Sequence, residues 1–187
     1  MAEEKKDDGP VKTTDLSEAK KKFSHVREYM NELSKQNILE PAMVKKPSKN
    51  DIVDNKVNVI YPVGDPIFIH ILKEQSGVIK YNVLQPILYD DENELYEKIS
   101  EKILDAAYRE PVPDKVIDIT EVLLKLLDQV TSIKGQGGGG LKERFFGEGK
   151  IHVTKEQYEK VKYFMIRNRV GFGKLQPLFY YESLEDI

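Results

Sequence analysis

Residues 57–72 read VNVIYPVGDPIFIHIL, and this stretch decides the fold. Every second residue from Val57 to Val63 is apolar, which predicts a strand over 57–63 that ends at the Gly64-Asp65-Pro66 turn. The run 67–72 carries apolar residues on both faces, which is typical of a buried strand. A break at 75–77 precedes a third run, 78–84. We therefore expect a small antiparallel meander whose middle strand is the most buried.

A helix is expected before these strands, beginning near Asp15. Asp15 and Glu18 have capping-box spacing, and the apolar residues that follow recur at alternating steps of three and four. This spacing places them on one face, which must pack against another element. A polar connector around 41–50 then leads to the strands. The apolar residues of the predicted face are Leu16, Ala19, Phe23, Val26, Met30 and Leu33.

Helical spacing returns after residue 86 and predicts three further helices. Acidic residues at 90–94 suit the N-terminus of the first of these, because the helix dipole favours negative charge there. The predicted spans are about 90–110, ended by Pro111 and Pro113; from about Asp114 to the glycine run at 137–140, with a wide apolar face that reaches Ile133; and from Thr154, which has capping-box spacing to Gln157, to Gly171.

The fold class expected from these elements is α+β and helix-dominant, with the small antiparallel meander packed against a helical bundle. Three segments are expected along the chain. Residues 1–14 are polar and form a flexible tail, residues 15–90 hold the first helix and the meander, and residues 91–187 form a helical subdomain. A glycine-rich loop at 135–140 is expected to be a hinge within that subdomain.

The composition excludes several classes of chemistry. The 187 residues include no Cys, which removes disulfides, thiolate nucleophiles and the commonest zinc sites. The 29 Lys and Arg nearly balance 32 Asp and Glu, so the net charge of −3 gives no overall attraction to nucleic acid. No apolar run approaches the length of a membrane span. We therefore expect a cytoplasmic protein.

The glycine run at 135–140 has the composition of a phosphate-binding loop but not its pattern. A Walker A loop ends in Lys followed by Ser or Thr, whereas Leu141, Lys142 and Glu143 follow here. The run also follows a predicted helix, whereas a phosphate-binding loop follows a strand. We interpret it as a flexible hinge.

The remaining candidates for chemistry have simpler structural interpretations. His25, His70 and His152 are far apart in the sequence, and no ligand spacing joins them, so no metal site is predicted. The acidic residues 90–92 are explained by a helix N-terminus. Lys20 to Lys22 are diluted by acidic neighbours and are interpreted as a solvated helix face, with docking to a partner protein as the second choice.

The residues from 163 onward read YFMIRNRVGFGKLQPLFYYESLEDI. They predict the end of a capped helix at Gly171, a second glycine, Gly173, that allows a tight reversal, and a short amphipathic turn anchored by Leu175, Leu178 and Leu184. The physical pattern alone indicates no function.

The same stretch resembles a signature of the type II and type IV secretion ATPase superfamily. In that family an Arg-Asp pair precedes Gly-Tyr-Gly, a Pro-Leu step follows, and Glu-Asp-Ile leads into the next domain. Asn168 stands where the family has Asp, and Tyr181-Glu182 replaces its Asp-Pro. The strands at 57–72 and the residues 81–86 are similar to the leading segment of the archaeal members, particularly the archaellum motor ATPases. The matching residues are Arg167, Gly171, Phe172, Gly173, Pro177, Leu178, Glu185, Asp186 and Ile187.

This resemblance implies a docking and regulatory module without catalytic residues of its own. The full-length protein would hydrolyse ATP with Mg²⁺ in a C-terminal RecA-like domain and would assemble as a hexamer at an archaellum, the archaeal motility filament. The implied partners are that C-terminal domain, the hexameric neighbours and other motor or membrane platform proteins, with no nucleic acid. The implied location is the cytoplasm, at the periphery of a membrane complex. By the same analogy, Arg167 and then Arg169 are candidates to approach the nucleotide.

Two alternatives remain open at this point. One is the N-terminal module of an archaeal type IV pilus or type II secretion ATPase. The other is a free-standing protein-binding or nucleic-acid-binding adaptor that uses Lys20 to Lys22 with Tyr29, and it predicts salt-dependent binding of oligonucleotides. An independent small enzyme has only scattered His and acidic residues in its favour.

Overall fold

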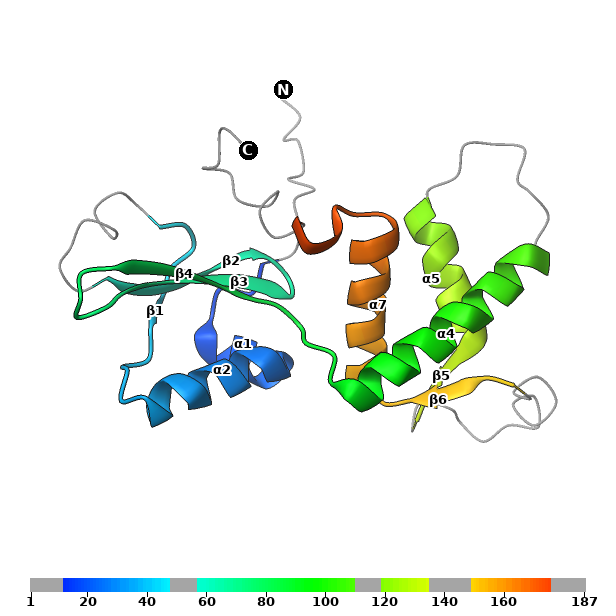
Figure 1. The fold of residues 1–187 in the computed structure, drawn as a ribbon, viewed down its shortest axis with the longest axis horizontal. Helices are drawn as coiled ribbons and strands as arrows, with labels where there is room; N and C mark the ends of the chain where they lie inside the picture. Colours follow the sequence, from blue (N-terminus) through cyan, green and yellow to red (C-terminus); the bar gives the residue numbers. More distant parts are fainter. Residues whose placement is uncertain (1–11, 48–56, 110–118, 135–148, 176–187) are drawn as a thin grey trace, which may run out of the picture. The chain divides into compact units, whose positions relative to one another are not determined.

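The computed structural model of the chain describes residues 12–47, 57–109, 119–134 and 149–175 (Figure 1). These residues fall into two compact units that divide between Pro86 and Ile87. The fold class is α+β with helices dominant, as predicted. Within these ranges no helix combines the length and the apolar character needed to cross a membrane. The glycine-rich loop at 135–140 and most of the expected tail at 1–14 lie outside the described residues.

The first unit contains a four-stranded sheet in the order β1-β2-β3-β4. Strands β2 (Asn58–Gly64), β3 (Ile67–Lys73) and β4 (Ile79–Leu84) form the predicted antiparallel meander. Strand β1 (Ala42–Met43) pairs with β2 in parallel, so the sheet is mixed rather than purely antiparallel. The prediction missed this strand because two residues within a polar connector show no alternation.

The expectation that the middle strand is the most buried was wrong. Six of the seven residues of β2 are buried, against five of seven in β3. The physical reason is the added strand: β1 lies beside β2, which makes β2 an interior strand rather than an edge. Edge strand β4 is the exposed one, with only Leu84 buried.

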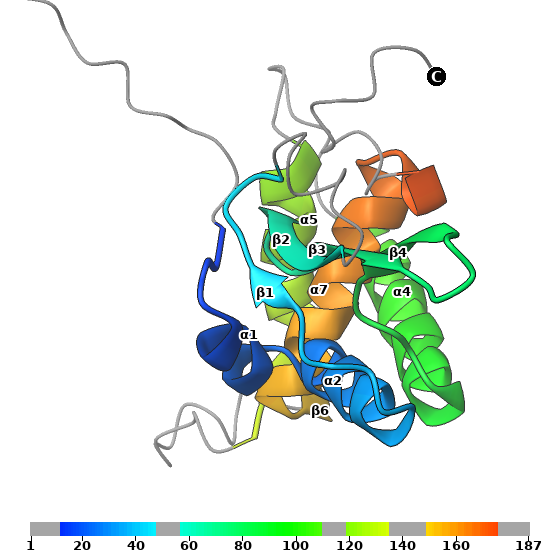
Figure 2. The same ribbon diagram turned by 90° about the vertical axis from the view of Figure 1, so that its left-hand side faces the viewer.

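Two helices, α1 (Leu16–Lys22) and α2 (Ser24–Lys35), cover one face of the sheet (Figures 1 and 2). A single helix was expected, but the chain is extended at Phe23, with φ −123° and ψ 114°. This break lets the Phe23 ring pack against Phe68, with 5.6 Å between ring centroids. The predicted apolar face is confirmed, since its other members are buried together with Ile60, Phe68 and Leu84 of the sheet.

The second unit holds α4 (Asp90–Arg109), α5 (Ile119–Val130) and α7 (Lys155–Arg169), with a two-stranded parallel sheet of β5 (Thr131–Ile133) and β6 (Ile151–Val153). The three helices share one core. Its buried residues are Tyr96, Ile99, Ile103, Leu126, Leu127, Val130, Val153, Val161, Phe164 and Met165.

Two local expectations fail in this unit. Residues 131–133, expected to continue a helix, form β5 instead, because Thr131 and Ile133 are β-branched and β6 offers a pairing edge. Leu175, expected to anchor a turn, lies in a 3-10 turn (η1, Gly173–Leu175) with 53% of its surface exposed. Leu178 and Leu184 lie outside the described residues, and so does the expected helix start near Asp114.

Candidate functional site

Helix α7 carries both arginines that the sequence singled out, and its own N-terminus is firmly capped. The Gln157 backbone N–H donates to the Thr154 hydroxyl at 3.1 Å, and the Thr154 N–H donates to the Gln157 side chain at 2.9 Å. This is the predicted capping box. At the other end, Arg167 and Arg169 both lie in the last turn. Cations are favoured there by the helix dipole.

Arg167 is held against its own helix. Its guanidinium lies 4.4 Å from the centroid of the Phe164 ring, and its Nε donates to the Asn168 side-chain oxygen at 3.0 Å. The Asn168 amide nitrogen in turn donates to the Tyr96 hydroxyl of α4 at 3.3 Å. A chain of contacts therefore orients Arg167 from two helices.

Arg169 is exposed, and it makes no hydrogen bond or ion pair with any residue that the structure describes. The chain then turns away through Gly171 and Gly173. Gly173 has φ +58°, in the left-handed region that favours glycine, and no atom lies within 4 Å of where its Cβ would be. The end of α7 thus presents one oriented and one unengaged guanidinium before a tight turn.

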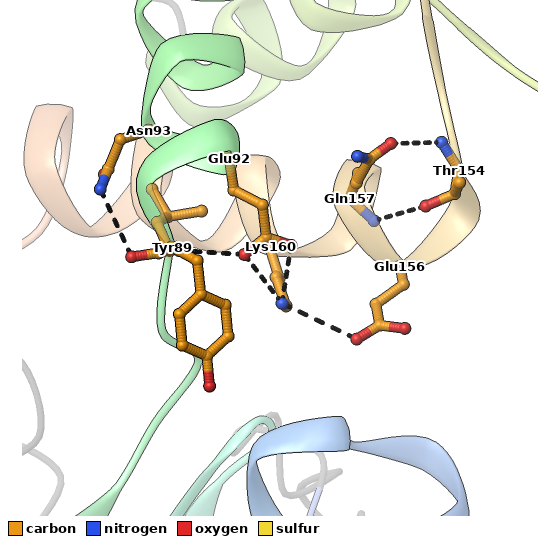
Figure 3. A network of polar contacts seen from close by, with 8 residues as sticks. Tyr89, Glu92, Asn93, Thr154, Glu156, Gln157 and Lys160 are labelled. Carbon is orange, nitrogen blue, oxygen red and sulfur yellow. Dashed lines mark hydrogen bonds and ion pairs between the residues drawn. The ribbon is translucent and has the colours of Figure 1, made fainter.

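The N-terminal half of α7 is fixed to the start of α4 by a buried ion pair (Figure 3). Lys160 Nζ lies 2.7 Å and 3.0 Å from the two carboxylate oxygens of Glu92, and both side chains are only 11–12% exposed. The Glu92 carboxylate also accepts from the Tyr89 backbone N–H at 3.1 Å. Glu156 lies 3.7 Å from Lys160 on the outer side.

The charged groups of Lys160 and Glu92 are occupied by their neighbours, so the pair is not available to a ligand. The ammonium stands 5.5 Å from the centroid of the Tyr89 ring and faces two carboxylates, while the Glu92 oxygens are occupied by the Lys160 and Tyr89 donors. Sequence analysis missed this pair. A usable signal existed, because Lys160 falls beside Val161 and four residues before Phe164 on the buried face of α7. A lysine on a buried face requires a partner.

A second polar contact joins α5 and α7. The Tyr158 hydroxyl donates to the Asp128 carboxylate, and Lys150 donates to the Asp128 backbone carbonyl at 2.9 Å. Burial and the adjacent Asp128 carboxylate raise the pKa of the Tyr158 hydroxyl well above its ordinary value. Tyr158 therefore stays protonated and acts as a hydrogen-bond donor, not as a base.

The three histidines are separated, and each is bound to a neighbour. His70 is fully buried, with Nδ1 2.8 Å from the Tyr29 hydroxyl and Nε2 2.7 Å from the Asn58 side-chain oxygen. His25 lies 2.9 Å from the Pro66 carbonyl, and the His152 Nδ1 contacts the Ser132 hydroxyl. Across the described ranges no three or more His, Asp or Glu residues group as a metal site would require.

The lysine cluster on the first helix is largely engaged with carboxylates. Lys20 lies 2.8 Å from Glu40, and Lys22 lies 2.7 Å from Asp65. Asp65 also accepts from the backbone N–H and the hydroxyl of Thr13, which is buried at the end of the expected tail. These pairs weaken the positive field that a nucleic-acid interface would need.

The described residues thus define a two-unit α+β protein whose second unit presents two arginines on a firmly held helix. No protein-family model matches the chain. The chain is 35% identical over 177 residues to the uncharacterized protein MJ0900 of Methanocaldococcus jannaschii. The match covers 92% of this chain and 32% of that protein, so the chain spans about a third of the length of this relative.

Proposed function

We propose that the chain is a non-catalytic docking and regulatory module of a hexameric archaellum assembly and rotation motor ATPase. The single observation that carries the proposal is the end of α7, where Arg167 and Arg169 stand directly before the Gly171-Phe172-Gly173 turn. ATP and Mg²⁺ would be bound by a separate C-terminal domain. The module would dock to that domain, to its hexameric neighbours and to membrane platform proteins.

The chemistry of the two arginines supports a phosphate-facing role. A guanidinium is planar, always charged, and offers five donors that match phosphate oxygens. Arg169 has these donors unengaged among the described residues, so binding a phosphate breaks no described contact. Arg167 is already oriented by Phe164 and Asn168, which reduces the entropy lost when it binds. In this arrangement Arg169 makes the contact, and Arg167 is held in position two residues before it.

The rigidity of the second unit supports a mechanical role. Helix α7 is joined to α4 through the Lys160–Glu92 pair and through a shared core, which favours movement of the arginines together with the helical unit. A module that transmits motion requires such stiffness. Among the described residues, bending would be confined to Gly171 to Gly173.

The similarity to an archaeal protein about three times as long also supports the proposal. A chain of that length has room for a further domain, as the motor ATPase hypothesis requires. The alternative of an archaeal pilus or secretion ATPase module uses the same arginines and differs only in the filament served.

The test is ATP hydrolysis by the complete product of the gene that encodes these residues. We expect a G-x-x-x-x-G-K-[ST] loop in that product and a loss of turnover of at least about tenfold in Arg169→Gln. Arg27→Gln, an exposed arginine on α2, is the matched control and should leave turnover unchanged. ATP turnover by the 187-residue chain alone, abolished by a change within it, would refute the proposal. Equal turnover in Arg169→Gln and Arg27→Gln would show that Arg169 has no role in ATP hydrolysis.

A further inference from the structure

A hollow of about 310 Å³ opens on the second unit, and none of the residues that carry the proposed function lines it. It lies between the C-terminal half of α4, the end of α5 and the residues just before β6. Its lining includes three cations and one carboxylate. These are Lys102, Asp105 and Arg109 of α4, and Lys150.

The three cations are not neutralised by the residues that the structure describes. Lys102 donates to the Gly149 backbone carbonyl, and Lys150 donates to the Asp128 backbone carbonyl at 2.9 Å. Neither these two nor Arg109 forms an ion pair with a carboxylate within the described ranges. Each ammonium therefore retains donors, and its position is fixed by a neutral carbonyl. The lining carries two more positive than negative charges.

We propose that this hollow binds a small phosphate ester that carries hydroxyl groups, such as a sugar phosphate. Lysine and arginine donors from separate segments would contact an anion bound in the hollow. Phosphate accepts several charge-assisted hydrogen bonds at once. Asp105 explains the choice of an ester over a bare anion. Its carboxylate repels a phosphate but accepts hydrogen bonds from sugar hydroxyls.

The volume of the hollow fits a ligand the size of a sugar phosphate. The volume of the hollow is at the lower end of the range for small-molecule sites. A hollow of this volume is too small for a large cofactor. Because the hollow is open to water, we expect a dissociation constant on the order of 1 mM for one phosphate group. This site is independent of the motor function proposed above.

The experiment is an NMR titration of the 187-residue chain with ribose 5-phosphate at low salt, with inorganic phosphate and ribose as comparison ligands. We expect the backbone amide signals of Ala106, Val130 and Gly149 to shift with ribose 5-phosphate. Inorganic phosphate should bind several times more weakly, and ribose should not bind. Absence of these shifts at about ten times the expected dissociation constant would overturn the proposal.

Charge variants locate the site. Arg109→Gln should weaken binding of ribose 5-phosphate about threefold or more, the effect of removing one unit charge near a phosphate in water. Arg109 makes no described hydrogen bond, so this variant leaves the fold unaffected. Lys98→Gln is the control, because Lys98 lies on the same helix, pairs with Glu94 and does not line the hollow. An equal loss of affinity in Lys98→Gln would show that the ligand binds nonspecifically to positive charge, and it would overturn the assignment of the site.

Asp105→Asn tests the ester assignment. It should strengthen binding of inorganic phosphate about threefold, because a repelling charge is lost. It should also reduce the preference for ribose 5-phosphate over phosphate, because the amide is a poorer acceptor for hydroxyls. An unchanged preference, or equal affinity of the original chain for the two ligands, would refute the choice of a hydroxyl-bearing ester.

Discussion

Acid should destabilise the first unit through His70, and the structure sets the size of the effect. The Asn58 side-chain nitrogen donates to the Leu39 carbonyl at 2.8 Å, which turns its oxygen toward His70 Nε2. Nε2 therefore carries the proton, and Nδ1 accepts from the Tyr29 hydroxyl. Protonating Nδ1 would reverse that hydrogen bond, with Nδ1 as the donor, and would place a charge in a fully buried site.

Burial lowers the pKa of His70 from its ordinary 6.5 to about 4. Between these two values the unfolded chain binds a proton that the folded chain does not, so stability is fully present above the unfolded pKa and is lost as pH falls. The loss is about 2 kcal/mol at pH 5 and approaches about 3 kcal/mol below pH 4.

The assay is a urea titration at about pH 7.5 and pH 5, read from the amide NMR signals of Ile69 and Ile71 so that the first unit is followed alone. His70→Gln keeps the polar contacts but cannot titrate, and His152→Gln removes a histidine from β6 as the control. The original chain and His152→Gln should lose about 2 kcal/mol more than His70→Gln between the two pH values. Equal losses in the original chain and His70→Gln would refute the reasoning.

Three further predictions concern the second unit. Lys160→Met should lower the free energy of unfolding by about 3 kcal/mol in urea, because Glu92 is left buried without its cation, whereas Lys160→Met with Glu92→Leu should restore most of it. Thr154→Ala should cost about 1 kcal/mol by thermal or urea unfolding, through loss of the helix cap. In an ultraviolet titration of the folded chain, Tyr158 and Tyr29 should ionise after the other tyrosines because both pKa values are raised, and Tyr158→Phe should reduce that late step by one tyrosine; an unchanged curve would contradict the Tyr158–Asp128 contact.

Elements with strong periodicity could be predicted from the sequence, and short or long-range features could not. The apolar spacing predicted the three meander strands and the buried face of α1 and α2. Strand β1 has two residues and β5 has three, too few for a period to appear. The break at Phe23 depends on a contact with Phe68, which lies in another element and leaves no local signal.

One part of the candidate site could also be predicted from the sequence, and another part could not. The position of Arg167 and Arg169 at the end of a capped helix was predictable, because the capping box and Gly171 mark both ends of α7. The path from Arg167 through Asn168 to Tyr96 was not, because Tyr96 lies on another helix, 72 positions away in the sequence. The Lys160–Glu92 pair spans 68 positions and was missed for the same reason.

Asn168 decides how Arg167 is held at the end of α7. In the family that this stretch resembles, the equivalent position usually holds Asp. The amide of Asn168 instead accepts from Arg167 and donates to Tyr96, so it orients the guanidinium without cancelling its charge. Arg169 forms no ion pair with a described residue, so its charge is uncompensated within the described ranges. If this module meets a nucleotide in trans, as proposed, an arginine oriented in advance favours binding because less side-chain entropy is lost.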